Sequence, residues 1–123
     1  MNFISNKAKI AQDVTLGKFN IIEDDVTIGS GSIIGNHVTI YNGTAIGGNV
    51  RIDDNAVIGK QPMRAANSIF KDTSMKSPCR IGDACIIGTS AVIYAGCTIG
   101  AKCLIADLAT VRPSLLERYL AAD

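Results

Sequence analysis

The sequence predicts an all-β repeat fold, and three regularities support this fold class. An aliphatic residue, almost always isoleucine, recurs at every sixth position in two long series. A small or β-branched residue stands two positions before most of these aliphatic residues, and a glycine follows eight of the sixteen. A fixed period marks a repeat architecture, and a period of six suits the strand repeat of two rather than the helical repeat of 3.6. Each repeat therefore combines a short strand with a turn.

The two series define the strands in order. The first runs without interruption from Ile4 to Ile58, and the second runs from Ile81 to Val111. Even spacing places the large and the small residue of each hexad on one side of its strand, so both are expected to be buried. The small positions hold Val14, Val26, Ser32, Val38, Thr44, Val50, Ala56, Cys79, Cys85, Ala91, Cys97, Cys103 and Ala109. Asn20 is a polar exception, and its buried amide is expected to need a hydrogen-bond partner.

This pattern resembles the hexapeptide-repeat proteins, which are left-handed parallel β-helices and chiefly acyltransferases. The resemblance covers about residues 3–111. It implies a left-handed winding with three hexads in each triangular coil, so that the sixteen hexads give just over five coils. At about 4.8 Å per coil the stack would be roughly 25 Å tall. We assign residues 1–112 to the β-helix domain and residues 113–123 to a separate terminal element.

Residues 60–78 interrupt the repeat and are predicted to form a long inserted loop. The step from Ile58 to Ile81 is far longer than the single hexad that separates neighbouring aliphatic positions elsewhere. The charged residues of the loop are Lys60, Arg64, Lys71, Asp72 and Lys76. The rest of the chain holds eight basic and ten acidic residues, so positive charge is concentrated in the loop. A loop of this length is either functional or a solvated segment, and its charge favours an arm that binds anions such as phosphates.

Residues 113–123 are predicted to form a short helix over the open end of the solenoid. Pro113 ends the repeat, and Ser114 and Glu117 have the spacing of a capping box before an apolar run. An uncovered end would present unpaired strand edges.

Composition indicates one domain and excludes several classes of protein. The net charge of the 123 residues is +1, which argues against general nucleic-acid binding. No apolar run reaches the length of roughly 18 residues that a membrane span requires. Residues 1–7 do not read as a secretory signal, so the expected compartment is the cytoplasm.

The four cysteines all occupy inward small positions and form two pairs whose members are one coil, or three hexads, apart. These pairs are Cys79 with Cys97 and Cys85 with Cys103. Parallel side chains on stacked coils would hold the Cβ atoms near the coil spacing, which is wider than a relaxed disulfide prefers. Reduced, unliganded thiols are therefore expected, although the spacing also invites the alternative of a disulfide.

Successive hexads assign the outward residues to three faces. The first face presents Phe3, Ile21, Thr39, Val57, Val92 and Thr110. The second presents Lys9, Thr27, Ala45, Arg80 and Thr98, and the third presents Thr15, Ile33, Arg51, Ile86 and Leu104. The first and third faces are largely apolar, and exposed apolar strips mark interfaces. Two such faces on one prism predict a closed homotrimer, which agrees with the trimers of the family that the sequence resembles.

His37, the only histidine, lies at the corner between the two apolar faces. Hexapeptide acyltransferases generally use a histidine at a subunit boundary as general base, so the resemblance implies this role for His37. The base would deprotonate an acceptor hydroxyl or amine that attacks the thioester of acyl-CoA. Asp54, one coil later at the same corner, is a candidate for orienting the imidazole, and Asn36 is a candidate for binding the acceptor. The alternative is a corner histidine without a chemical role.

The second series resembles the donor-binding end of sugar acetyltransferases, in residues 81–88 and 92–100. There, backbone groups at small corner residues accept the pantetheine arm, and basic residues meet the nucleotide phosphates. By position, the candidates for acetyl-CoA are Gly88, Thr89, Ser90, Ala95, Gly96, Gly100 and Ala106, with Lys102 and Arg112 for phosphate. The family's Gly-Ala-Gly-Ser run is replaced by residues 106–109, Ala-Asp-Leu-Ala.

Residues 58–62 resemble the loop start of acyltransferases that act on nucleotide-linked sugars. Lys60, Arg64 and Lys71 are therefore candidates for contacts with the acceptor.

The leading interpretation is a cytoplasmic, homotrimeric transferase that moves an acyl group from CoA to a small acceptor, and the resemblance implies that the group is acetyl. The acceptor class is a sugar or a nucleotide-linked sugar. A non-catalytic trimeric scaffold or assembly protein is the alternative, favoured by the single histidine and the replaced glycines. A carbonic-anhydrase-type metalloenzyme needs several histidines, so no metal site is expected. Ice binding would need threonines aligned one full coil apart, whereas Thr15, Thr27 and Thr39 follow at intervals of two hexads and fall on different faces.

Overall fold

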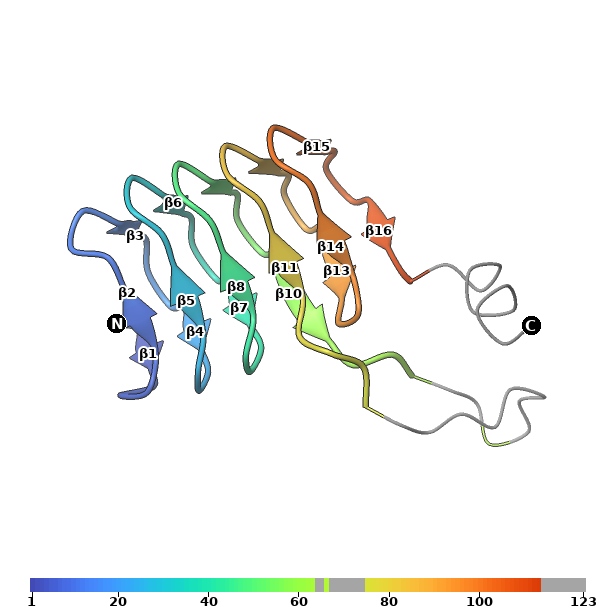
Figure 1. The fold of residues 1–123 in the computed structure, drawn as a ribbon. Coiled ribbons are helices and arrows are strands. Elements are labelled where there is room, and N and C mark those ends of the chain that lie inside the picture. Colours follow the sequence, from blue (N-terminus) through green and yellow to red (C-terminus); the bar gives the residue numbers. More distant parts are fainter. Residues whose placement is uncertain (64–65, 67–74, 114–123) are drawn as a thin grey trace.

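Sixteen short strands form a continuous coil in the computed structural model, which describes residues 1–63, 66 and 75–113 (Figure 1). Face A contains β1 (Phe3–Ile4), β4 (Ile21–Ile22), β7 (Thr39–Ile40), β10 (Val57–Lys60), β13 (Val92–Tyr94) and β16 (Thr110–Val111). Face B contains β2 (Lys9–Ile10), β5 (Thr27–Ile28), β8 (Ala45–Ile46), β11 (Arg80–Ile81) and β14 (Thr98–Ile99). Face C contains β3 (Thr15–Leu16), β6 (Ile33–Ile34), β9 (Arg51–Ile52), β12 (Ile86–Ile87) and β15 (Leu104–Ile105).

The three faces are parallel sheets in which each strand pairs with the strand three places later in the chain. Phe3 pairs with Ile21, which is a register of one coil, or three hexads. The stack continues across the insertion, because Ala45 of β8 pairs with Arg80 of β11. These pairings confirm the predicted all-β solenoid and the membership of all three faces, and they are consistent with a left-handed β-helix.

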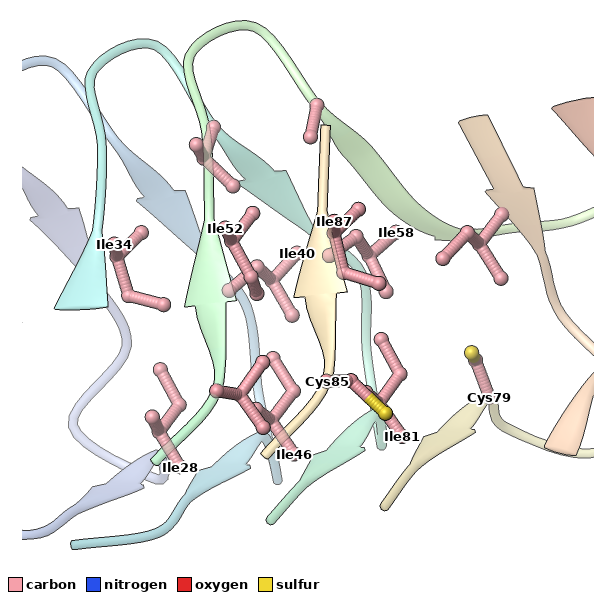
Figure 2. Close-up of a cluster of buried hydrophobic side chains, with 14 of the residues drawn as sticks. Ile28, Ile34, Ile40, Ile46, Ile52, Ile58, Cys79, Ile81, Cys85 and Ile87 are labelled. Carbon is pink, nitrogen blue, oxygen red and sulfur yellow. The ribbon is translucent and has the colours of Figure 1, made fainter. Parts of the chain in front are cut away.

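Ladders of isoleucine fill the interior of the coil. Figure 2 shows Ile34, Ile52 and Ile87 in one row, with Ile40 and Ile58 on another side of the interior. These side chains are almost fully buried, and each contributes about 1.5–3 kcal/mol through the removal of apolar surface from water. The first coil is less protected, because no earlier coil covers it in the described residues.

Three corners connect the faces, and we name them corner AB, corner BC and corner CA in the order in which the chain meets them. Nine non-glycine residues have positive φ angles, and each stands three positions after an aliphatic residue of the ladder. All of their amides except that of Asp25 donate to carbonyl groups of the preceding coil; at corner CA, for example, His37 N donates to Lys18 O at 2.9 Å. This ladder offsets the cost of the left-handed conformation, which is about 1–2 kcal/mol per residue.

The polar residue predicted to need a partner has one. Asn20 is buried, and its Oδ1 accepts a hydrogen bond from Val38 N at 2.8 Å. Its Nδ2 has no partner among the described residues, and neither does the buried hydroxyl of Thr44.

The cysteines correct one expectation from the sequence. Cys79, Cys85 and Cys97 are buried and free, as expected for inward small positions, but Cys103 is exposed. Its coil is the last complete one in the described residues, so no full coil covers its thiol from the far side.

Some predictions fall outside the described residues. The helix expected in residues 113–123 lies outside the described residues, apart from Pro113. The loop residues Arg64 and Lys71 also lie outside them. In the residues that the structure does describe, no helix is long and apolar enough to cross a membrane.

Candidate functional site

His37 lies at corner CA, where its backbone follows the corner ladder with a φ angle of 56°. Its ring stacks on Phe19 of the preceding coil, with centroids 5.3 Å apart and planes 12° apart. Neither ring nitrogen has a hydrogen-bond partner in the described part of the chain. One ring face is therefore shielded by an apolar neighbour while both nitrogens stay open to an incoming group.

Asp54 and Asn36, the predicted companions of His37, bond to the backbone of the corner instead. Asp54 Oδ1 accepts from Asn36 N at 2.8 Å, and Asn36 Oδ1 accepts from Lys18 N at 2.7 Å. Asp107 holds Thr89 N in the same way at 2.7 Å. In this structure the Asp54 carboxylate supports the stacking of coils, and no hydrogen bond joins it to His37 among the described residues.

The predicted donor-binding residues lie at three different corners of the chain. Gly88, Thr89, Ser90 and Ala106 lie at corner CA, Gly100 and Lys102 at corner BC, and Ala95, Gly96 and Arg112 at corner AB. Lys60, predicted for the acceptor, also lies at corner AB. The structure therefore brings Lys60 together with the predicted donor-binding residues of corner AB. The donor-binding residues of corners BC and CA lie apart from them.

Gly59 places Lys60 at corner AB. The pairing of β10 with β13 shifts register between Ile58 and Lys60, so that Lys60 becomes the partner of Tyr94. Gly59 has a φ angle of +89°, which glycine adopts without the penalty that a side chain would bring. The bulge extends β10 beyond the usual two residues and directs the chain into the insertion.

Two cations meet one aromatic ring at this corner. Arg112 Cζ lies 4.6 Å from the centroid of the Tyr94 ring, and its Nη2 donates to Tyr94 Oη at 3.3 Å. Lys60 Nζ lies 6.0 Å from the same centroid, and Tyr94 itself is only 4% exposed. Sequence reasoning missed Tyr94. The available signal was an aromatic residue directly after Ile93, where many other hexads have glycine.

The neck of the insertion is fixed against the same corner. The Gln61 amide makes two bonds to the backbone of Lys76: Lys76 N donates to Oε1 at 2.9 Å, and Nε2 donates to Lys76 O at 3.1 Å. Ala95 N donates to Lys60 O at 2.8 Å, and Gly96 N donates to Ser77 O at 2.6 Å. Both ends of the loop are thus held next to Tyr94.

A shallow groove of about 210 Å³ runs beside Arg112. Its lining residues are Gly96, Cys97, Thr98, Ile99, Val111, Arg112 and Pro113. A second groove of about 370 Å³ lies on face C around Arg51, Ile86 and Leu104. No cluster of three or more histidine, cysteine, aspartate or glutamate side chains suited to a metal ion occurs within the described ranges.

Comparison with protein families gives one match. The family described as bacterial transferase hexapeptide, six repeats, matches residues 7–42 and 78–113, which together are more than half of the chain. A comparison with curated proteins gives no significant match.

Solved structures that are similar to this chain include acyltransferases. The UDP-N-acetylglucosamine acyltransferase of Francisella novicida is 30% identical with a TM-score of 0.79, over 89% of this chain and 41% of that chain. LpxA from Acinetobacter baumannii is 25% identical with a TM-score of 0.77, over 89% of this chain and 43% of that chain. AntD, an N-acyltransferase from Bacillus cereus, is 16% identical with a TM-score of 0.55 over 93% and 71%, which shows a shared fold. This chain spans about two fifths of the length of the first two proteins.

Proposed function

Because the chain belongs to the hexapeptide-repeat family of bacterial transferases, we propose that it is, or forms part of, an acyl-CoA-dependent acyltransferase. The proposed donor is acetyl-CoA, and the proposed acceptor is a hydroxyl or amine of a sugar or nucleotide-linked sugar. The observation that carries this proposal is the family match, together with the likeness to the Francisella acyltransferase and to LpxA at 25–30% identity. The two cations at corner AB, beside the small residues Ala95 and Gly96, support the proposal of phosphorylated ligands, because positive charges suit phosphate groups.

In the proposed reaction a general base removes a proton from the acceptor hydroxyl or amine. The freed electron pair attacks the thioester carbonyl, the carbon–sulfur bond breaks, and the base returns the proton to the CoA thiolate. We assign the base to His37, because its imidazole is exposed at the corner and neither ring nitrogen has a hydrogen-bond partner in the described residues. In this assignment Asp54 contributes its negative charge to the corner, and Asn36 contacts the acceptor.

Geometry within one chain separates this base from the loop. His37 precedes β7 at corner CA, and the loop leaves face A at corner AB. The extended chain from His37 to Asn42 crosses face A over roughly 16 Å, so the base would work with the loop of a neighbouring chain in a homotrimer. Corner CA residues Gly88, Thr89 and Ser90 would then contact the donor together with Lys102 or Arg112 of another chain.

The distribution of the candidate residues over three corners favours a second function. A non-catalytic trimeric scaffold needs the stacked coils and apolar faces but no convergent site.

Two measurements on the whole chain separate these functions. Calorimetry with acetyl-CoA should show binding, and release of the CoA thiol should follow when nucleotide amino sugars are added. His37→Asn should lower turnover by about 10²-fold or more while acetyl-CoA still binds. Asparagine is the chosen replacement because it tolerates the left-handed backbone at this corner.

The matched control is Ala84→Asn, which places an asparagine at an exposed residue with a φ angle of 60° on corner BC, and it should keep full turnover. No binding of acetyl-CoA at millimolar concentration would support the scaffold. Full turnover in His37→Asn would keep the transferase and remove His37 as its base.

A further inference from the structure

Corner AB carries an unbalanced pair of positive charges. Lys60 and Arg112 both lie within 6.0 Å of the Tyr94 ring centroid, and neither forms an ion pair with any described residue. By contrast, the exposed Arg51 on face C has Asp53 as its partner at 2.8 Å. Two cations gathered on one side chain repel each other unless an anion lies between or beside them. The arrangement therefore favours a negatively charged ligand at this corner.

Tyr94 holds one of these cations in place. The phenol oxygen accepts one of the five N–H donors of Arg112, and the guanidinium lies over the ring, so the other donors remain available to a ligand. A guanidinium held in this way loses less conformational freedom when it binds a phosphate. Because the tyrosine is only 4% exposed, a ligand would touch Arg112 rather than the ring.

Backbone contacts fix the main chain that carries the other cation, Lys60. Lys60 is the last residue of the extended strand β10, and its carbonyl accepts a hydrogen bond from Ala95 N at 2.8 Å. Gly96 is packed closely against Lys76 and Pro113, because an added Cβ would lie 3.2 Å from Lys76 Cβ and 3.0 Å from Pro113 Cγ. Gly96 and Arg112 both line the groove of about 210 Å³, which runs along Thr98 and Ile99.

We propose that Lys60 and Arg112 bind the diphosphate group of a nucleotide ligand at corner AB, and that Tyr94 is the positioning residue for Arg112. Two separate cations around one ring suit two linked phosphate groups better than one, since each phosphate then meets its own cation. This inference rests on the proposed transferase function for the source of the ligand, which is the nucleotide-linked acceptor or the donor. The site itself requires only the anion.

The first test measures the binding of inorganic pyrophosphate and orthophosphate to the whole chain by calorimetry at low ionic strength. Pyrophosphate should bind more tightly than orthophosphate, and 0.5 M NaCl should weaken its binding strongly. Lys60→Met and Arg112→Gln should each lower the affinity for pyrophosphate by about tenfold. Arg80→Gln, which removes an exposed arginine of face B, is the matched control and should leave the affinity unchanged.

The second test separates a positioning role of Tyr94 from a purely structural one. Tyr94→Phe keeps the buried ring and removes only the oxygen that holds Arg112, so it should lower pyrophosphate affinity by about three- to tenfold without changing the thermal midpoint. In the background of Arg112→Gln, the same change should have no further effect. UDP and CoA should both be tested as competitors of pyrophosphate, and the one that displaces it at the lower concentration identifies the acceptor or the donor as the source of the diphosphate.

Several results would overturn the proposal. One is the absence of pyrophosphate binding at millimolar concentration. Another is an equal loss of pyrophosphate affinity in Arg80→Gln and Arg112→Gln. The third is that the losses of affinity caused by Tyr94→Phe and Arg112→Gln add together in the double variant. Pyrophosphate binding without any acyl transfer would keep this site while rejecting the proposed transferase activity. Acyl transfer that none of these substitutions affects would keep the proposed transferase activity while rejecting this site.

Discussion

Thiol groups occupy four of the small inward positions, and their surroundings give them different chemistry. Burial raises the pKa of the Cys79 thiol to about 12, with a smaller contribution from the neighbouring Cys97. Desolvation also raises the pKa of Cys97. Because the thiolate is the reactive form, both groups should be inert in the folded protein. Cys103, which is exposed, lacks this protection.

We therefore predict that Cys103 reacts first with an alkylating reagent at pH 8 in the native protein. Protein denatured without reductant should then show four free thiols. Peptide mass spectrometry after a short pulse of reagent checks the order of labelling. A stable count of two free thiols after denaturation would instead reveal a disulfide between stacked coils.

The pKa of Cys79 also predicts a dependence of folding stability on pH. Its folded pKa of about 12 is above the ordinary value of 9.0, so the folded state keeps its proton when the unfolded state has lost it. This contribution is complete below pH 9 and is lost as the pH rises from 9 to about 12. Urea midpoints should therefore fall more steeply between pH 8 and 10.5 in the wild type than in Cys79→Ala. Equal slopes would contradict the assignment.

Single residues also show where sequence reasoning succeeds. The need of Asn20 for a partner follows from its position in the pattern, and Val38 N supplies that partner. The exposure of Cys103 could not be predicted from the pattern, because burial there depends on a covering coil. Tyr94 was missed because a hexad pattern marks inward and outward positions but not which side chains meet at a corner.

The element that departs most from the repeat is β10, and a single glycine allows the departure. Regular hexads give strands of two residues, whereas β10 extends to Lys60 through the bulge at Gly59. The hexad pattern predicts where each strand lies and which face it joins. The bulge depends on backbone torsion angles and cross-strand pairing, so the pattern carries no signal for it.

Gly59→Ala should destabilise the protein by about 2 kcal/mol, through the left-handed φ angle and through contact of the new methyl group with the buried Thr44 hydroxyl. The thermal midpoint should fall by several degrees. The matched control is Gly100→Ala, because no atom lies within 4 Å of its added Cβ, and it should leave the midpoint nearly unchanged. Similar midpoints in the two variants would show that the bulge tolerates a side chain.

At the scale of the whole molecule, faces A and C expose more apolar surface than face B. Phe3 is 75% exposed on face A, and Ile33 and Leu104 are 53% and 67% exposed on face C. At corner CA, between these faces, Phe19 and Leu108 are also exposed. Arg51, the one arginine among the outward residues of the face C strands, is paired with Asp53, and this ion pair lowers the desolvation cost of burying Arg51 in an interface. This surface supports the predicted homotrimer, in which face A of one copy would meet face C of the next.

Ile33→Asp or Ile86→Asp should therefore weaken assembly, because each places an unpaired charge in the middle of the face C strip. Light scattering of the wild type in dilute buffer should give about three times the chain mass of 12.9 kDa, and the variants should shift toward a single chain. Thr27→Asp on face B is the control: it adds the same charge at an exposed strand position of the polar face and should leave the trimer intact.

The same variants bear on the proposed chemistry, since His37 and the loop of one chain lie at opposite corners of face A. If the site forms between chains, turnover should fall in parallel with the trimer fraction, and Thr27→Asp should keep both. A wild-type monomer would contradict the interface. Full turnover in a monomeric variant would place the reaction within one chain, where face A separates His37 from Lys60, so the base would then have to be another group.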